Sequence, residues 1–218
     1  MSPFGPAAFL LLAAFLPAGA SATEPASACL DAAAVAERDW TLPTNMIAAI
    51  GRVESGRLDR LTGRVSPWPW TVNANGSGSY FATRAEAVSF VRNLQASGVR
   101  LIDVGCFQID LFYHPAAFAS LEDAFDPAAN AQYAARFLTT LHGQTQSWPA
   151  AVARYHSSSA LEGEAYRQKV MSQQDLGSAQ PGVTASHAVA RTMRLQPPED
   201  RYVILMSAAA RAIRVIGP

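Results

Sequence analysis

The sequence has no excess of charge of either sign. Its 17 Lys and Arg residues balance 17 Asp and Glu residues, so the formal net charge of the 218-residue chain is zero. Proteins that bind nucleic acids along the phosphate backbone usually carry a strongly basic surface. The balance of charge therefore argues against a nucleic-acid partner.

A long apolar run is also missing, since a helix needs about 20 consecutive apolar residues to span a bilayer. The run Ala7–Leu16 is too short, and it is followed by Ala20-Ser21-Ala22, a small-residue cleavage pattern. This combination is typical of a secretory signal peptide, which we predict over residues 1–22. We expect the mature protein to be exported and to have no transmembrane segment.

Cysteine occurs only twice, as Cys29 and Cys106. An even number in an exported chain favours a disulfide, which stabilises a fold by roughly 4 kcal/mol when it closes so long a loop. Two alternatives are a lipoprotein box ending at Cys29 and a catalytic thiol at Cys106. The first is disfavoured because Ala26 stands where a larger aliphatic residue is usual. The second is disfavoured because the sequence offers Cys106 no evident His partner.

Length and composition allow one core of ordinary size, because half of the residues are hydrophobic and no internal repeat is present. We predict a single domain over residues 23–175 that is mainly α, in the α+β class. Residues 176–218 contain five Arg and two acidic residues, a net charge of +3. We interpret them as a linker and a basic C-terminal tail, in which a short helix can form over residues 202–215.

Helical periodicity and capping residues predict six helices within the domain. A β-hairpin is predicted around Asn75-Gly76, which aromatic and β-branched residues flank. The β-branched stretch Val99–Asp110 can add a third strand before a turn at Gly105, whereas Leu58–Ser66 is polar and resembles a loop. The expected helices span residues 29–40, 46–55, 84–97, 127–142, 148–156 and 163–174.

Glu54, at the end of the second predicted helix, is the main candidate for chemistry. Asn45 precedes this helix, apolar residues repeat along it, and Gly56 is expected to end it in the left-handed conformation. Burial beside the apolar stripe raises the pKa of a carboxyl group and suits it to general acid catalysis. The alternative is an ordinary solvated glutamate at a helix end.

Two further segments place polar side chains among apolar ones. Gln108 lies between Phe107 and Ile109, where an amide is either a satisfied core group or a ligand contact in a cleft. Tyr155 and His156 end a predicted helix much as Glu54 does.

Four motifs, taken together, resemble the soluble lytic transglycosylase family, which has a lysozyme-like fold. The resemblance covers about residues 29–174 and rests on the order and spacing of the motifs. They are Glu54-Ser55-Gly56, Gly105-Cys106-Phe107-Gln108-Ile109, Asp126-Pro127 with Asn130, and Ala153-Arg154-Tyr155-His156.

The resemblance implies a fold, an activity and a location. It implies a lysozyme-like helical domain with a small β-hairpin or three-stranded sheet, acting on peptidoglycan glycan strands in the periplasm. The family cleaves the β-1,4 bond between N-acetylmuramic acid and N-acetylglucosamine and forms 1,6-anhydromuramic ends. It needs no metal and no organic cofactor. The family often opens the cell wall for flagella, pili or secretion machines, so the tail is a candidate contact with such a cell-envelope machine.

The same resemblance assigns roles to individual residues. Glu54 becomes the single acid and base, Gln108 lies in the sugar-binding cleft, and Tyr155 lies beside the glutamate. His156 stands where the family usually has Asn; either side chain can donate a hydrogen bond, but His adds pH dependence. The family's usual Ser upstream of the Gly-x-x-Gln motif has no clear counterpart. Trp70 is a candidate sugar platform, with core packing as its alternative.

Two alternative functions remain at this stage. A hydrolytic muramidase would need a second carboxylate, for which Asp59, Asp103 and Asp110 are candidates. A non-catalytic peptidoglycan-binding or assembly protein would keep the fold and use the Arg-bearing tail as its contact.

Overall fold

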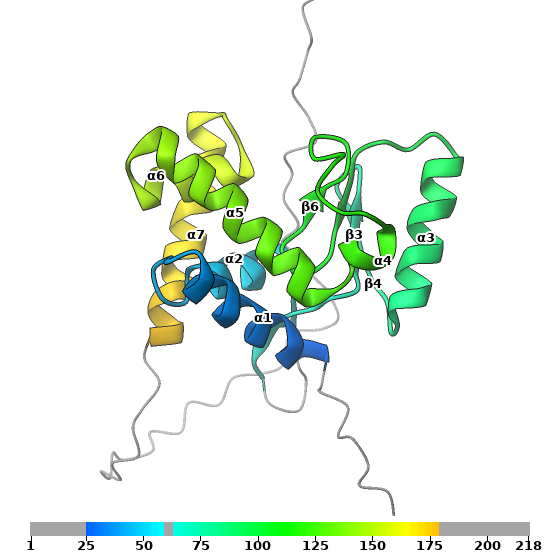
Figure 1. Cartoon of the computed structure of the whole chain (residues 1–218), viewed down its shortest axis with the longest axis horizontal. Helices are drawn as coiled ribbons and strands as arrows, with labels where there is room; N and C mark the ends of the chain where they lie inside the picture. The colour runs from blue at the N-terminus through cyan, green and yellow to red at the C-terminus, as the bar shows by residue number, and fades with distance from the viewer. Residues whose placement is uncertain (1–24, 59–62, 179–218) are drawn as a thin grey trace, which may run out of the picture.

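The computed structural model describes residues 25–58 and 63–178 (Figure 1). The predicted signal peptide, Asp59 and the tail from residue 179 onward lie outside the described residues. No helix within the described ranges is long and apolar enough to cross a bilayer.

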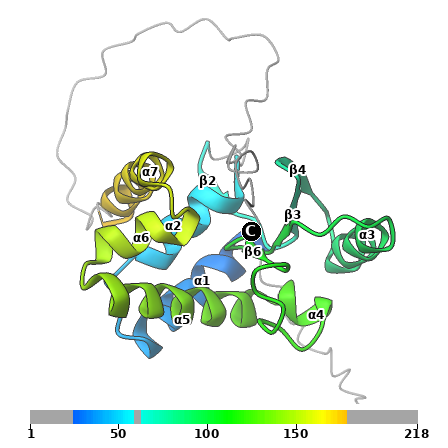
Figure 2. The ribbon, with the colours of Figure 1, turned by 90° about the horizontal axis from the view of Figure 1, so that it is seen from above.

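The described chain consists of a group of helices on one side of a small sheet, with α3 and the short α4 packed on its other side. Seen from above, the helical group and α3 flank strands β3 and β4 (Figure 2). This architecture confirms the predicted mainly α fold with a small sheet. The helices are α1 (Pro25–Asp39), α2 (Met46–Ser55), α3 (Arg84–Ala96), α4 (Leu121–Ala124), α5 (Pro127–Thr145), α6 (Trp148–His156) and α7 (Ala160–Ser178).

The main sheet is antiparallel and has the strand order β4-β3-β5-β6. Its hairpin turns at Asn75 and Gly76, whose φ angles of 52° and 82° fit a two-residue turn. The sheet exceeds the predicted three strands because the chain returns along β5 after the Gly105 turn. Its strands are β3 (Thr71–Ala74), β4 (Ser77–Tyr80), β5 (Ile102–Val104) and β6 (Ile109–Asp110).

A second, two-stranded sheet corrects the loop expected over Leu58–Ser66. Strand β1 (Gly56–Leu58) pairs with β2 (Val65–Pro67) directly after α2. The prediction for Gly56 was also wrong, because its φ of −58° is not left-handed. Gly56 instead begins β1, where a Cβ atom would lie only 2.2 Å from the carbonyl oxygen of Arg52. Close backbone approach, rather than a left-handed turn, therefore requires glycine here.

The boundaries of the outer helices also differ from prediction. Helix α1 begins at Pro25, four residues before Cys29, and α7 runs from Ala160 to Ser178 rather than over residues 163–174. Local patterns rarely fix helix ends to better than a few residues.

Helix α2 begins on a cap supplied by another helix. Asn45 directly precedes the helix, but it has a left-handed backbone and its side chain makes no capping hydrogen bond. The buried carboxylate of Glu37 in α1 instead accepts hydrogen bonds from the backbone N–H groups of Asn45 (2.8 Å) and Ala48 (3.1 Å). A negative charge at a helix N-terminus satisfies otherwise unpaired N–H groups and interacts favourably with the helix dipole.

The apolar side chains form two clusters. One lies among α1, α2, α5, α6 and α7, and the other lies between the main sheet and α3. Gly51 allows α2 to approach the chain after β5, because a Cβ there would lie 2.8 Å from the Phe107 ring. The predicted disulfide is confirmed: Cys29 in α1 is bonded to Cys106 in the same turn, with 5.8 Å between the Cα atoms. The disulfide therefore holds helix α1 against the turn that follows β5.

Candidate active site

Glu54 lies in the last turn of α2, and the next residue fixes that helix end. Ser55 is fully buried, and its hydroxyl donates a 2.6 Å hydrogen bond to the Cys106 carbonyl. The backbone N–H of Trp68 donates to the Ser55 hydroxyl (3.2 Å) and to the Ser55 carbonyl (3.0 Å). The backbone that carries Glu54 is thus tied to two segments distant in sequence.

The turn from Gly105 to Gln108 is held from below by Asn130 of α5. The Asn130 carboxamide accepts from the N–H of Phe107 (2.9 Å) and donates to the carbonyls of Val104 (3.1 Å) and Ala124 (3.0 Å). A Cβ at Gly105 would lie 2.5 Å from Asn130, and the φ of Gly105 is +85°. Glycine is therefore required at the first position of the motif for two independent reasons.

Gln108 ends this turn with a left-handed backbone, φ 47°. Its Nε2 donates to the carbonyls of Gly105 (2.9 Å) and Thr71 (3.2 Å), so the side chain links the turn to β3. Its Oε1 is buried and has no hydrogen-bond partner within the described chain. The oxygen of Gln108 is thus a buried acceptor that no described group satisfies.

Tyr155, near the end of α6, donates a 2.9 Å hydrogen bond from its hydroxyl to the Phe107 carbonyl. Burial raises the pKa of Tyr155 well above its usual value, and the nearby charge of Glu54 raises it further. The structure therefore brings Tyr155 near Glu54. Its bonded partner, however, is the turn that carries Gln108.

Tyr166 of α7 faces Glu54 and was not identified from the sequence. The hydroxyl group of Tyr166 lies close enough to oppose the rise in the pKa of Glu54, but it does not reach full hydrogen-bond geometry with any described group. Its ring stacks on His156, with ring centroids 4.6 Å apart and planes 8° apart. The imidazole of His156 therefore supports Tyr166, and burial lowers the pKa of His156. Spacing alone marks Tyr166 as a core residue of α7, which is why sequence reasoning missed it.

The electrostatics of the site are dominated by burial. Burial raises the pKa of Glu54 from 4.5 to about 7. It also raises the pKa of Asp103 from 3.8 to about 8, with further contributions from the charges of Asp110 and Glu54. Asp103 in β5 and Asp110 in β6 are direct cross-strand partners. A protonated Glu54 near neutral pH can act as a general acid, and a second carboxyl group lies within its electrostatic reach.

Trp68 and Trp70 are both partly buried and contact each other. Trp70 is partly buried against the cluster between the sheet and α3 and meets Trp68 edge to face, with ring centroids 5.6 Å apart. The guanidinium of Arg57 lies 4.2 Å from the Trp68 ring centre. Core packing accounts for part of Trp70, and nothing in the geometry tests its predicted contact with sugar.

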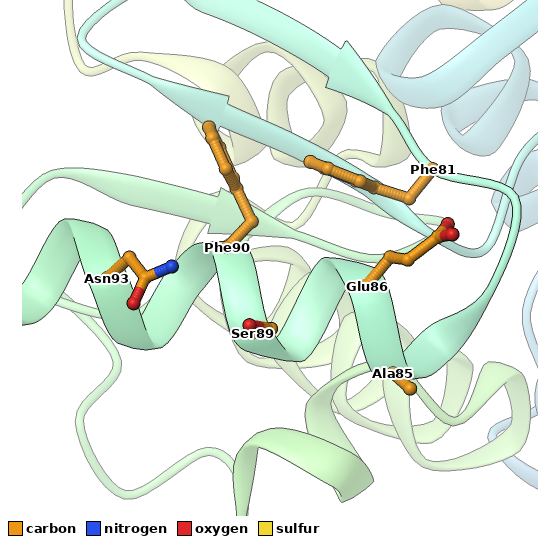
Figure 3. Close-up of a pocket in the computed structure, with 6 residues that line it drawn as sticks. All are labelled: Phe81, Ala85, Glu86, Ser89, Phe90 and Asn93. Carbon is orange, nitrogen blue, oxygen red and sulfur yellow. The ribbon is translucent and has the colours of Figure 1, made fainter.

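A pocket of about 510 Å³ lies away from these residues, between Phe81 and the outer side of α3 (Figure 3). The Phe81 and Phe90 rings contact each other there at an interplanar angle of 44°, with centroids 4.9 Å apart. Its one carboxylate, Glu86, accepts the N–H bonds of Ala82 and Thr83 and completes the capping box of α3. The residues around Glu54 are therefore the better candidate for chemistry.

The described residues contain no group of three or more His, Cys, Asp or Glu side chains placed to hold a metal ion. We identify no set of side chains there that suggests a cofactor.

Comparison with known proteins gives one match. The family model for the transglycosylase SLT domain matches residues 31–175. No curated protein and no solved structure matches the chain.

Proposed function

The chain belongs to the transglycosylase SLT-domain family, and on this premise we propose that it cleaves peptidoglycan as a lytic transglycosylase. The bond cleaved is the β-1,4 link between N-acetylmuramic acid and N-acetylglucosamine, and the product carries a 1,6-anhydromuramic end. The observation that supports this proposal best is Glu54, a carboxyl group on a fixed helix end whose pKa burial raises to about 7.

In the proposed reaction, protonated Glu54 donates its proton to the oxygen of the glycosidic bond as the bond to C1 breaks. The acetamido group of the substrate stabilises the positive charge that develops on the sugar. Glu54, now a carboxylate, takes the proton of the C6 hydroxyl, whose oxygen attacks C1 and closes the anhydro ring. One carboxyl group thus performs both proton transfers, and no water is consumed.

The surrounding residues would position substrate and acid. Gln108 offers an unpaired acceptor to a hydroxyl or N–H of the sugar. Tyr155 holds the turn that carries Gln108, and Tyr166 faces the carboxyl of Glu54. His156 acts through its stacking on Tyr166.

Export to the periplasm is part of the proposal. It is supported by the signal-peptide pattern of residues 1–22 and by the disulfide, since structural disulfides persist in oxidising compartments. A contact between the basic tail and a cell-envelope machine remains a proposal from sequence alone.

A hydrolytic muramidase is the second candidate, and Asp103 is the observation that favours it. Hydrolysis with inversion or retention uses two carboxyl groups. Asp103 is partly exposed, the charge of Glu54 contributes to the raised pKa of Asp103, and Asp110 lies directly opposite Asp103.

Analysis of muropeptides tests the proposal. Purified protein is incubated with murein sacculi, and the released products are analysed by mass spectrometry. We expect products one water lighter than reducing muropeptides, and a loss of at least 100-fold in their rate of release with Glu54→Gln. Glu122→Gln, an exposed carboxyl of α4, is the matched control and should retain full activity. Reducing ends would support the muramidase, and full activity in Glu54→Gln would contradict both enzymes.

A further inference from the structure

Asp103 and Asp110 form a pair of neighbouring carboxyl groups within the electrostatic reach of Glu54. The register of the sheet places Asp103 of β5 directly opposite Asp110 of β6. Directly opposite residues of antiparallel strands project to the same face, with their Cβ atoms about 4.5 to 5.5 Å apart. The two side chains are hydrogen-bonded to each other, and such a bond needs a proton on one of them. Because two carboxylates so close repel each other, the pair holds one proton near neutral pH.

The contacts of Asp110 decide which of the two groups carries that proton. The Oδ1 atom of Asp110 accepts hydrogen bonds from the backbone N–H groups of Phe112 (2.6 Å) and Tyr113 (2.9 Å). Hydrogen bonds from N–H groups stabilise the charged form of a carboxyl group. The negative charge therefore stays on Asp110, and the proton is held by Asp103.

The surroundings of Asp103 favour the same protonation state. Asn73 of β3 lies directly opposite Asp103 on its other side, and the buried Oδ1 of Asn73 has no hydrogen-bond partner among the described residues. An ionised Asp103 would place a negative charge between this carbonyl oxygen and Asp110. Burial, followed by the charges of Asp110 and Glu54, raises the pKa of Asp103 to about 8. At pH 7 such a group is about nine-tenths protonated.

Two further titratable groups face the pair, and both are mainly neutral at pH 7. Tyr155 of α6 lies near Asp103 and Glu54; burial raises its pKa well above the ordinary value, and both charges raise it further. His114 follows β6, and its Nδ1 lies 2.8 Å from the Tyr133 hydroxyl. Burial lowers the pKa of His114 from 6.5, although the charge of Asp110 opposes this change. Neither group removes the proton from Asp103.

The protonation state of Asp103 bears on which reaction can follow cleavage. In hydrolysis, a carboxylate takes a proton from water as the oxygen of that water bonds to C1. A protonated Asp103 cannot take this proton. In ring closure, the C6 oxygen bonds to C1, and its proton goes to Glu54, which has just given its own proton to the leaving oxygen. Ring closure therefore needs no second base.

We propose that Asp110 is a positioning residue for the reaction: it holds the proton on Asp103, so that cleavage ends in ring closure rather than in hydrolysis. This inference rests on the proposed function and names the residues that set its outcome. Asp110 acts through Asp103 and needs no contact with the substrate.

The test compares the ends of the products that variants release from murein sacculi at pH 7. Asp110→Asn keeps the shape of the side chain and an oxygen that can accept from Phe112 and Tyr113, but it removes the negative charge. We expect the pKa of Asp103 to fall from about 8 toward about 7 in this variant, which raises its ionised fraction about fivefold. The fraction of muropeptides with reducing ends, measured by mass spectrometry, should rise by a similar factor.

Two further variants assign the effect. The double variant Asp103→Asn, Asp110→Asn should return the fraction of reducing ends to the native value, because a neutral amide replaces the group that takes the proton from water. The control is Asp123→Asn, the same change at an exposed position of α4, which should alter neither this fraction nor the rate.

The native chain supplies a readout that a structural role of the pair would not produce. Between pH 7 and pH 9 the ionised fraction of Asp103 rises from about one-tenth to about nine-tenths. The fraction of reducing ends should rise with it, in incubations long enough to compensate for slower cleavage. In Asp103→Asn this fraction should not depend on pH.

Each contrary outcome separates the inference from the proposed function. A fraction of reducing ends that stays low in Asp110→Asn or, if that variant does not fold, in the native chain at pH 9 contradicts the role of Asp110 alone. A fraction that rises in Asp110→Asn and stays high in the double variant contradicts the assignment to Asp103. Mainly reducing ends from the native chain at pH 7, or no cleavage at all, contradicts the proposed function itself.

Discussion

The position and the pKa of one carboxyl group, that of Glu54, are set by the residues around it. Its helix end is fixed by Ser55, and burial keeps it protonated to about pH 7. Because burial disfavours the charged form, Glu54 keeps the proton that acid catalysis requires.

The pH dependence of activity follows from that pKa. The proposed reaction begins with protonated Glu54, so kcat/KM for peptidoglycan should fall as the pH rises above about 7. A pH profile measured on solubilised glycan strands checks this. A profile that falls only near pH 4.5, the ordinary value for glutamate, would contradict the assignment.

The free energy of unfolding should also depend on pH through Glu54, and the raised pKa fixes the direction of this dependence. The folded-state pKa of Glu54 lies above its ordinary value, so its protonated form stabilises the fold below pH 4.5, and this contribution is lost as the pH rises through about 7. Glu54→Gln should therefore be more stable than the native chain at pH 8, by up to about 3 kcal/mol, and similar to it at pH 4. Urea unfolding at the two pH values measures the difference. Equal stability at pH 8 would mean that the carboxyl is not buried in solution.

At the scale of the element, α2 depends on α1 for its start. The Glu37 carboxylate satisfies two N–H groups at the head of the helix that carries Glu54 at its tail. The two helices are therefore joined by charge and hydrogen bonding as well as by apolar packing.

Removal of this cap should be costly. We expect Glu37→Ala to lower the free energy of unfolding by about 1 to 2 kcal/mol, because two buried N–H groups lose their acceptor. Glu122→Ala breaks an ion pair with Arg92, in which the Glu122 side chain is 47% exposed and the Arg92 side chain 61% exposed. This change should lower the free energy of unfolding by well under 1 kcal/mol. Urea denaturation at pH 7 compares the two. Equal losses would show that the Glu37 cap is not formed in solution.

At the scale of the whole molecule, the disulfide joins α1 to the turn beneath the site. It links residues separated by 77 positions, and Cys106 also provides the carbonyl that Ser55 binds. Cys106 thus connects the disulfide to the residue next to Glu54, because its carbonyl accepts a hydrogen bond from Ser55.

Reduction of this disulfide should destabilise the protein strongly. The chain-entropy model gives about 4 kcal/mol for a loop of this size. We expect a clear fall in Tm on addition of dithiothreitol, measured by circular dichroism. The Cys29→Ser, Cys106→Ser double variant should show the lower Tm without reductant and no further change with it. A reductant effect that persists in the double variant would assign the change to another cause.

Features that depend on interactions between residues close in sequence could be predicted, and features that depend on distant residues could not. The Asn75-Gly76 turn was predicted because it depends on two adjacent residues. The capping box of Thr83 and Glu86 and the cap of α5 by Asp126 likewise join residues within a few positions, and helices were predicted at both places. The four motifs of the family placed Glu54, Gln108 and Tyr155 in one region.

The missed features depend on contacts between distant segments. Glu37 of α1 caps a different helix, α2, and Tyr166 reaches Glu54 from α7. Asn73 lies directly opposite Asp103, a residue 30 positions later in the chain, on the neighbouring strand. A single residue in a pattern does not reveal such partners. His156 is the instructive case, since the family comparison marks its position but only packing shows that it stacks on Tyr166.

The packing of α7 against α2 also has a consequence for the order of events during synthesis. The chain makes Glu54 early, but the wall that Tyr166 provides belongs to the last described helix. Contacts between such distant segments form only when the intervening chain exists, and they make folding slower than local contacts do. The unfinished chain therefore carries the acid without its surroundings. The surroundings that raise the pKa of Glu54 are complete only when the whole domain has been synthesised.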